Sequence, residues 1–187
     1  MLAITPYNAP LLLVAHKLAS AYAAGNPCIV RPASKTPLSA LSLGEIMLEA
    51  GALPGAVSVV PCPSALGERM AGDDRVKMLS FTGSAEVGWY LQKVAATQRV
   101  TLELGGNGAV IIHSDADLDH AAERCALGGF VRAGQACISV QRVFVAADVA
   151  AAFEEKFVSR VSALNCSTTT ADSSIEPDSR RLSPNTR

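Results

Sequence analysis

The sequence predicts an α/β protein built around a parallel sheet. Between residues 10 and 145, short apolar runs typical of strands alternate with longer runs of helical spacing, so that a helix separates successive strands. Such helices form right-handed crossovers, which bring the strands together in parallel. The composition agrees, because a chain with 49% hydrophobic residues and a net charge of −1 can form a core and is not disordered throughout.

Local signals place the individual elements. Gly25 and Asn26 end the first helix, and Thr36 and Pro37 begin the second as its N-cap and first helical residue. The acidic residues Asp115 and Asp117 mark the start of a later helix, where negative charge is favourable. The expected helices cover residues 10–24, 37–50, 64–71, 84–96, 117–130 and 148–164, and the expected strands cover residues 28–30, 56–60, 76–80, 100–104, 109–112 and 141–146.

The chain is expected to divide after residue 103. Residues 104–108 (Leu-Gly-Gly-Asn-Gly) form a hinge-like stretch, so residues 1–103 make a first domain and residues 104–164 the start of a second. Residues 165–187 differ in kind, because nine of them are Ser or Thr and few are apolar. We expect this tail to be disordered, since it cannot bury enough apolar surface to offset its ordering entropy.

Charge and cysteine usage exclude several classes of function. The balance of 16 Lys and Arg against 17 Asp and Glu leaves no long-range attraction for nucleic acid or an anionic membrane. Five cysteines without a Cys-x-x-Cys pair, and three scattered histidines, indicate neither a disulfide framework nor a metal site, so a cytoplasmic setting is expected. The most apolar stretch, residues 9–24, is interrupted by His16 and Lys17, is too short to span a bilayer and has no features of a signal peptide.

Two polar segments fall where strands end, and open α/β sheets bind ligands at such places. Gly83 and Ser84 lie between a strand and a helix, so backbone N–H groups of the first helical turn can face a phosphate. An ordinary turn with Ser84 as the N-cap is the alternative. Glu103 ends an apolar strand, where partial burial would raise its pKa toward that of a general base. A paired or solvated Glu103 is equally compatible with the spacing.

Cys137 is the candidate nucleophile. It lies in a polar, glycine-containing segment after a helix, where a thiol can stay exposed and backbone dipoles can lower its pKa. The alternative is a packing role, which is the commoner one for cysteine. The other cysteines look inert by position, and they are Cys28, Cys62, Cys125 and Cys166.

Taken together and in this order, these segments resemble the aldehyde dehydrogenase superfamily. Three segments carry the resemblance, namely residues 81–84 (Phe-Thr-Gly-Ser), 103–107 (Glu-Leu-Gly-Gly-Asn) and 134–137 (Gly-Gln-Ala-Cys). Residues 5–10 (Thr-Pro-Tyr-Asn-Ala-Pro) and 36–41 (Thr-Pro-Leu-Ser-Ala-Leu) support it, and it covers about residues 4–164. The resemblance implies a Rossmann-like parallel sheet with flanking helices as a partial cofactor domain for NAD or NADP, followed by the start of an α/β catalytic domain.

The resemblance also implies roles for individual residues. Cys137 corresponds to the nucleophile that attacks the aldehyde carbon, and Asn8 to the amide that holds the oxyanion together with the backbone N–H of the cysteine. Glu103 corresponds to the base that activates water to hydrolyse the thioester left after hydride transfer. The cofactor contacts correspond to Tyr7, Arg31, Ser34, Gly83, Ser84 and Leu104.

Two departures from the family pattern concern the cofactor. Arg31 stands where the family usually has Lys, and it presents a wider, planar fork to the ribose. Ser34 stands where NAD-preferring members commonly carry a Glu that binds the ribose hydroxyls and repels a 2′-phosphate. Because Arg31 and Lys35 lie beside Ser34, we expect use of both cofactors with some preference for NADP.

The largest departure is length. Family members are much longer and act as homo-oligomers on small aldehydes, so this chain is expected to be a fragment that is inactive alone, with residues 165–187 as a tail foreign to the family. Residues 137–142 look more like the lactaldehyde and phosphonoacetaldehyde branches than the betaine aldehyde branch. Two alternatives stay open: a non-catalytic module that binds a nucleotide or a partner chain, and a decayed gene product without function.

Overall fold

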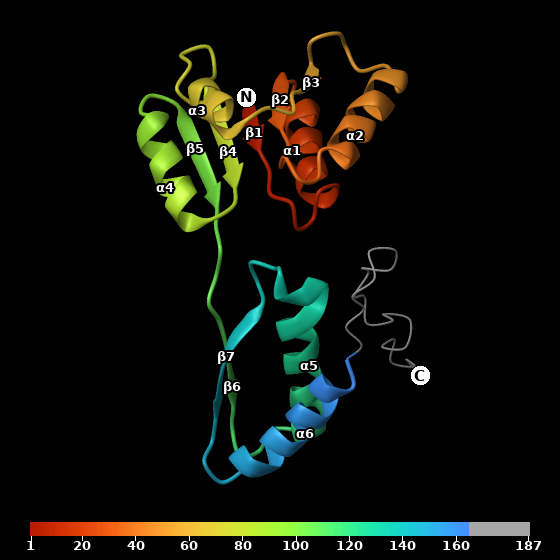
Figure 1. The fold of residues 1–187 in the computed structure, drawn as a ribbon, viewed down its shortest axis with the longest axis vertical. Helices are drawn as coiled ribbons and strands as arrows, with labels where there is room; N and C mark the ends of the chain where they lie inside the picture. Colours follow the sequence, from red (N-terminus) through yellow and green to blue (C-terminus); the bar gives the residue numbers. More distant parts are fainter. Residues whose placement is uncertain (165–187) are drawn as a thin grey trace. The chain divides into compact units, whose positions relative to one another are not determined.

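The computed structural model describes residues 1–164 and forms two compact units, Met1–Gly105 (unit 1) and Gly106–Arg187 (unit 2) (Figure 1). The boundary falls inside the glycine-rich stretch that the sequence predicts as a hinge. The expected disordered tail, residues 165–187, lies outside the described residues.

Unit 1 is built on a five-stranded sheet in the order β3-β2-β1-β4-β5 (Figure 1), and all neighbouring strands are parallel. Helices alternate with these strands along the chain, which confirms the predicted fold class. The strands are β1 (Leu2–Ile4), β2 (Cys28–Arg31), β3 (Val57–Val59), β4 (Met78–Thr82) and β5 (Arg99–Glu103), and the helices are α1 (Leu12–Ala23), α2 (Leu38–Glu49), α3 (Ser64–Ala71) and α4 (Ala85–Val94).

The central strand, β1, is the element that the sequence analysis did not assign. Its three residues are too few to show the alternation of apolar and polar positions that marks a strand. All three are nevertheless buried, and the strand pairs with β2 on one side and β4 on the other. The strand at the centre of the sheet is therefore one that is too short to be predicted from the sequence pattern.

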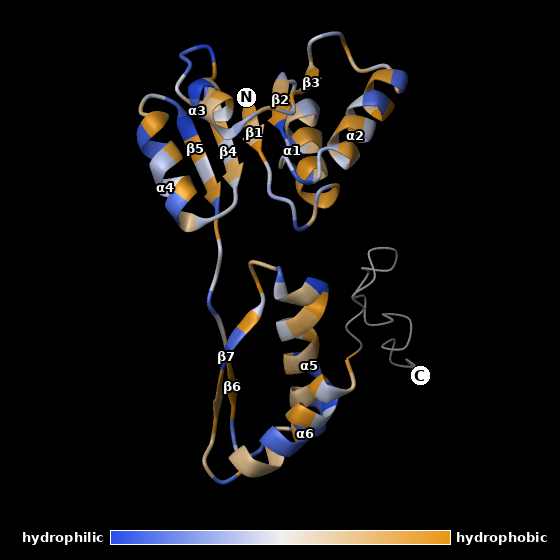
Figure 2. Cartoon of the chain, viewed as in Figure 1, coloured by the Kyte–Doolittle hydropathy of each residue, from blue (hydrophilic) through white to orange (hydrophobic). Residues whose placement is uncertain are grey.

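Each face of this sheet has its own apolar core, visible as the orange positions that line the elements in Figure 2. Leu2 and Ile4 of β1 join Leu79 and Phe81 of β4 in a cluster with residues of α3 and α4. Ala3 points to the opposite face, because successive side chains of a strand alternate, and it joins apolar residues of β2, α1 and α2. The sheet is thus covered by helices on both faces, as parallel sheets generally are.

Unit 2 contains a two-stranded parallel sheet with two helices packed on one face. Ile112, Cys125 and Phe153 form the centre of its core. The opposite face exposes Ile111 (80%) and Phe144 (54%). The elements of unit 2 are β6 (Gly108–Ile112), α5 (Leu118–Phe130), a short turn η1 (Val131–Gly134), β7 (Val140–Val145) and α6 (Ala150–Ser162).

Two local predictions were wrong. Thr36 does not cap α2, which begins after Pro37 without a side-chain cap, and the Thr36 hydroxyl is buried with no hydrogen-bond partner among residues 1–164. β4 begins at Met78 instead of Val76, because the Val76 N–H donates to the carbonyl of Asp73 and so closes a turn before the strand starts. The predicted cap Ser84 is observed, and Asp117, expected as part of the acidic start of its helix, is the N-cap of α5; each accepts a hydrogen bond from the first turn of its helix.

Substitution of Leu79 tests the packing of the central strands. Leu79 is fully buried in β4, so Leu79→Ala is expected to lower the free energy of unfolding by about 2–5 kcal/mol, through lost burial and a residual cavity. The matched control is Leu53→Ala, since Leu53 is 70% exposed. Urea unfolding followed by circular dichroism measures both, and equal losses would contradict the placement of Leu79 in the core.

Candidate active site

Residues expected to act in catalysis or to bind the cofactor lie at or after the carboxyl ends of the strands of unit 1. Asn8 comes after β1, Arg31 ends β2, Ser84 comes after β4 and Glu103 ends β5. Because all five strands are parallel, these positions share one edge of the sheet. The chain moves outward from β1 through β2 to β3 and then returns to the other side of β1 with β4, so the order reverses between β1 and β4. Open α/β sheets place ligands at such reversal points.

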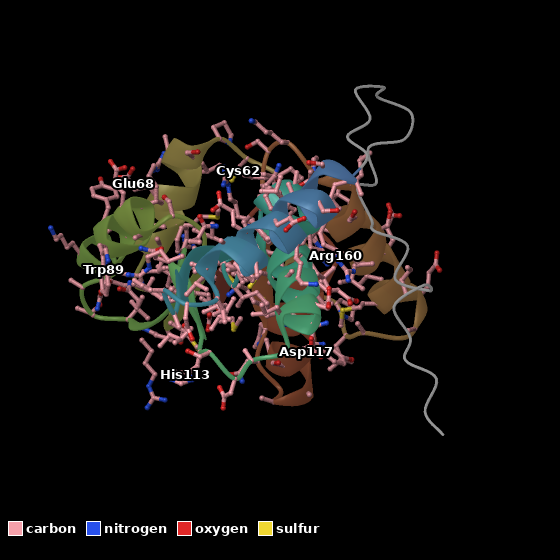
Figure 3. The ribbon with its side chains drawn as sticks, turned by 90° about the horizontal axis from the view of Figure 1, so that it is seen from below. Cys62, Glu68, Trp89, His113, Asp117 and Arg160 are labelled. Atoms are coloured by element: carbon pink, nitrogen blue, oxygen red, sulfur yellow. The ribbon has the colours of Figure 1, made fainter. Side chains whose placement is uncertain are left out.

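Arg31 is held at this edge by a set of oxygen acceptors. Its guanidinium donates to the Cys62 carbonyl from Nε (3.3 Å) and Nη2 (3.1 Å), and Nη2 also lies 3.3 Å from the hydroxyls of Ser34 and Ser64. Ser64 is the first residue of α3, and Figure 3 labels Cys62 in the segment that leads into that helix. The planar fork is therefore fixed beside the two hydroxyls.

Lys35, in the segment that follows β2, lies against a residue of the segment that follows β1. The Lys35 ammonium is 5.9 Å from the centroid of the Tyr7 ring, which places it within cation–π range. Tyr7 is half exposed. The segments that follow β1 and β2 are thus connected through side chains, and both carry residues that the sequence analysis assigned to the cofactor.

The turn after β4 contains the predicted helix cap. The Ser84 hydroxyl accepts a hydrogen bond from the Val87 N–H at 3.4 Å, so the capping role is real. Gly83 donates its N–H to the Glu103 carbonyl at 3.0 Å, which ties the end of β4 to the end of β5. A phosphate contact at Gly83 and Ser84 stays a prediction. Leu104 packs against the core beneath this turn and would contact a Cβ at Gly88.

Glu103 differs from the expectation in one respect. Its side chain is exposed, so the partial burial predicted for this carboxylate is wrong. The alternation of β5 explains the difference, because Leu102 and Leu104 point toward the core and Glu103 points to the other side.

Lys17 is a charged residue of this region that the sequence analysis did not assign a role. It extends from α1, and its ammonium donates to the Ser80 hydroxyl of β4 at 2.7 Å. Burial lowers the pKa of Lys17, and the negative charge of Glu103 opposes that shift. Its only sequence signal is its position as a charge inside the apolar run of residues 9–24.

Cys137 is exposed, as expected for a nucleophile. The turn before it is left-handed, with φ of 53° at Arg132, 57° at Ala133 and 74° at Gly134. This conformation costs about 1–2 kcal/mol at each residue other than glycine, and such strain is concentrated at functional sites. After the cysteine, Ser139 is 1% exposed and its hydroxyl donates to the Gly129 carbonyl at 3.1 Å. The exposed Cys137 therefore lies between a strained turn at residues 132–134 and Ser139, whose buried side chain is hydrogen-bonded to the end of α5.

The other described cysteines lie in less reactive surroundings. Cys28 is buried in β2, and burial raises the pKa of its thiol to about 11. Cys125 is buried in α5, where burial also raises the pKa. Cys62 is half-buried. Position alone had predicted all three to be inert, whereas Cys166 lies outside the described residues.

The three groups expected to carry the chemistry are divided between the units. Asn8, which is half-buried, and Glu103 belong to unit 1, while Cys137 belongs to unit 2. Their mutual approach therefore stays a prediction.

Within residues 1–164, no cluster of His, Cys, Asp and Glu could hold a metal ion. The three histidines are exposed; they are His16, His113 and His120, and Figure 3 labels His113. Among the same residues, no helix has both the length and the apolar character needed to cross a membrane.

Comparison with known proteins agrees with these observations. The model of the aldehyde dehydrogenase family matches residues 1–177, which extends beyond the expected limits of residues 4–164 at both ends. Among curated proteins, 3-sulfolactaldehyde dehydrogenase of Priestia aryabhattai is 46% identical over 155 residues, which are 82% of this chain and 32% of that protein. This chain therefore spans about a third of the length of the curated relatives it matches.

Solved structures of similar proteins share the fold. A NAD-dependent benzaldehyde dehydrogenase from Corynebacterium glutamicum has a TM-score of 0.84 and 38% identity, over 90% of this chain and 38% of that one. An NADP dependent enzyme from E. coli has a TM-score of 0.85 and 40% identity, over 88% of this chain and 35% of that one.

The environments of the cysteines predict an order of alkylation. Of the cysteines within residues 1–164, Cys137 is expected to be modified first in a brief reaction with iodoacetamide at pH 8 and Cys62 more slowly, while Cys28 and Cys125 are spared. The thiolate is the reactive form, and at pH 8 a buried thiol with a pKa of about 11 stays protonated.

Peptide mass spectrometry measures the modified fraction at each position, and the chain unfolded in urea is the control in which these differences disappear. Modification of Cys28 as fast as Cys137 in the folded chain would contradict the assignment.

Proposed function

This chain belongs to the aldehyde dehydrogenase family, and we propose that it carries the nucleophile and the cofactor-binding edge of an NAD(P)-dependent enzyme that oxidises an aldehyde to a carboxylic acid. This chain spans about a third of the length of its curated relatives, and we expect it to be inactive when isolated.

One observation carries this proposal. Asn8, Arg31, Ser84 and Glu103 follow four different strands that are separated by helices in the sequence, and the sheet order brings them to one carboxyl edge around the reversal point between β1 and β4. Plain strand-to-helix turns would not require amide, guanidinium, hydroxyl and carboxylate groups at the same edge. The exposed Cys137 in a strained segment supports the proposal from unit 2.

The residues present fit a dinucleotide. The first turn of α4 offers backbone N–H groups that have no partner within the helix, and they suit a pyrophosphate. The fork of Arg31 and the hydroxyls of Ser34 and Ser64 suit the oxygen atoms of a ribose or of a phosphate on it. Bound NAD(P)⁺ would supply the acceptor for the hydride that leaves the aldehyde carbon.

The protein's own groups would perform the other steps. The Cys137 thiolate attacks the aldehyde carbon, and the carbonyl oxygen becomes an oxyanion that accepts hydrogen bonds from the Asn8 amide and the Cys137 backbone N–H. After the hydride has left, a thioester remains on the cysteine. Glu103 then removes a proton from a water molecule whose oxygen attacks the thioester carbon, which releases the carboxylic acid and regenerates the thiolate. An exposed Glu103 is accessible to that water.

A chimera tests the catalytic role. Residues 1–164 would replace the equivalent segment of the Priestia 3-sulfolactaldehyde dehydrogenase, and NAD(P)H absorbance would report turnover of 3-sulfolactaldehyde, lactaldehyde and benzaldehyde. The chimera is expected to be active. Cys137→Ala should reduce kcat/KM by about a thousandfold or more, since no other group supplies the covalent step.

Cys62→Ala is the matched control and should retain most of the activity, because Cys62 contributes only its backbone carbonyl to Arg31. Turnover that survives Cys137→Ala would reject the assigned nucleophile. An inactive chimera that still binds NADPH would favour a non-catalytic nucleotide-binding module.

The cofactor is proposed to be used in both forms, with a preference for NADP. Ser34 has no charge to repel a 2′-phosphate, and its hydroxyl lies 3.3 Å from Nη2 of Arg31. The hydroxyl of Ser64 is at the same distance from that nitrogen, so a phosphate at this position would meet a guanidinium and two hydroxyls. Of the two similar structures above, the Corynebacterium enzyme is NAD-dependent and the E. coli enzyme is NADP dependent, so similarity supports the use of both forms.

Ser34→Glu tests this preference. The new carboxylate would face Arg31 and repel a 2′-phosphate, so the Kd for NADPH should rise about tenfold or more, while the Kd for NADH changes by less than about threefold. Calorimetric titration of the folded chain measures both constants. Ser159→Glu adds the same charge at an exposed position of α6 and should change neither, whereas equal weakening of both cofactors by Ser34→Glu would contradict the assignment.

A further inference from the structure

The two glycines that precede and open β6 lie against the backbone of the Cys137 segment. A Cβ placed on Gly106 would lie closer than 3.0 Å to the Cys137 carbonyl oxygen, a separation that real Cβ atoms essentially never show. A Cβ on Gly108 would lie 2.9 Å from the Ser139 carbonyl oxygen. The neighbouring Gly105 has nothing within 4 Å of its Cβ position. Within this glycine-rich stretch, Gly106 and Gly108 thus lie against the backbone of the Cys137 segment, whereas Gly105 does not.

The obstacle at both positions is backbone, and this decides the consequence of a side chain there. A flexible side chain could rotate away from an added methyl group, whereas a carbonyl oxygen moves only with its peptide unit. The Cys137 carbonyl carbon is bonded directly to the Cα that carries the thiol side chain, so a shift of this carbonyl group also shifts the thiol.

The segment is fixed on its other sides. Gly108 pairs with Val140 at the start of β7, the Ser139 hydroxyl donates to the Gly129 carbonyl, and Nη2 of Arg142 donates to the Asn107 carbonyl at 3.0 Å. These bonds hold the strand and the cysteine segment at a set separation. An added methyl group therefore has to be accommodated at residues 137–139 or to break this pairing.

We propose that Gly106 and Gly108 are positioning residues for Cys137. Because they have no side chain, the backbone of residues 106–108 can lie directly against the peptide units of residues 137–139. This close contact determines the position of the Cys137 thiol. The catalytic meaning of that placement rests on the proposed function, but the placement itself is a property of unit 2 and can be measured without an aldehyde or a cofactor.

The test compares single Gly→Ala variants of the full chain. The rate of Cys137 alkylation by iodoacetamide is followed by peptide mass spectrometry, with Cys62 of unit 1 as the internal reference in each sample. Gly106→Ala and Gly108→Ala are each expected to change the Cys137 alkylation rate by about threefold or more, because a shift of the backbone at residues 137–139 changes the position of the reacting thiol. Gly105→Ala is the matched control and should leave the rate unchanged.

A second control separates positioning from loss of stability. A Cβ at Gly128 would lie 2.8 Å from Cγ2 of Val140, so Gly128→Ala disturbs the packing of α5 on β7 through a side chain. It is expected to change the urea midpoint of unit 2 and to leave the Cys137 rate within about twofold of the original. If Gly106→Ala does not fold, Gly108→Ala carries the test, since its contact is the milder of the two.

Cys137 rates that are the same in Gly105→Ala and in the folded variants of Gly106 and Gly108 would overturn the proposal. A rate change in Gly128→Ala as large as in Gly106→Ala would also overturn it, because the effect would then follow general packing. Failure of the proposed function would leave these results intact and would show itself in the turnover of the chimera.

Discussion

The candidate site depends on the pairing of β1 with both of its neighbours. This three-residue strand has no solvent-facing side, and its register aligns Ile4 with Arg31 of β2 and with Phe81 of β4. Those three residues precede the segments that carry Asn8, Ser34 and Ser84. A displacement of β1 would therefore misalign the carboxyl ends of the strands on both sides, and with them every group proposed to contact the cofactor in unit 1.

The sequence predicted the elements whose signals are local and long enough to show a period. Helices with strong boundaries, such as α3 and α5, lie within a residue of their expected positions, and the cap at Ser84 forms as expected. β1 was not found, because three apolar residues have no period, and its central position follows from pairing with strands that lie far away in the sequence. Thr36 shows the limit of a cap signal, since Pro37 begins the helix without using the hydroxyl that precedes it.

The site divides in the same way. The types and order of Asn8, Glu103 and Cys137 could be read from motifs, and the exposure of Cys137 agrees with that interpretation. The sequence left both a partly buried and a solvated Glu103 open, because its exposure depends on which face of β5 meets the core. The contacts of Arg31 with the Cys62 carbonyl and the Ser64 hydroxyl, and that of Lys17 with Ser80, join residues that are at least 30 positions apart. No local pattern contains such contacts.

The charges at this edge show why composition gave no sign of an anionic ligand. The net charge of −1 describes the whole chain, whereas Arg31 ends β2, Lys35 lies in the segment that follows it, and the positive end of the α4 dipole lies just beyond the end of β4. Lys17 adds a half-buried ammonium behind β4, and its lowered pKa reflects the burial of that charge. Glu103 is the acidic group whose charge opposes that shift. An anionic cofactor would thus meet a local excess of positive charge that a balanced total conceals, and the recognition of its phosphates is a question of placement at one sheet edge, independent of net charge.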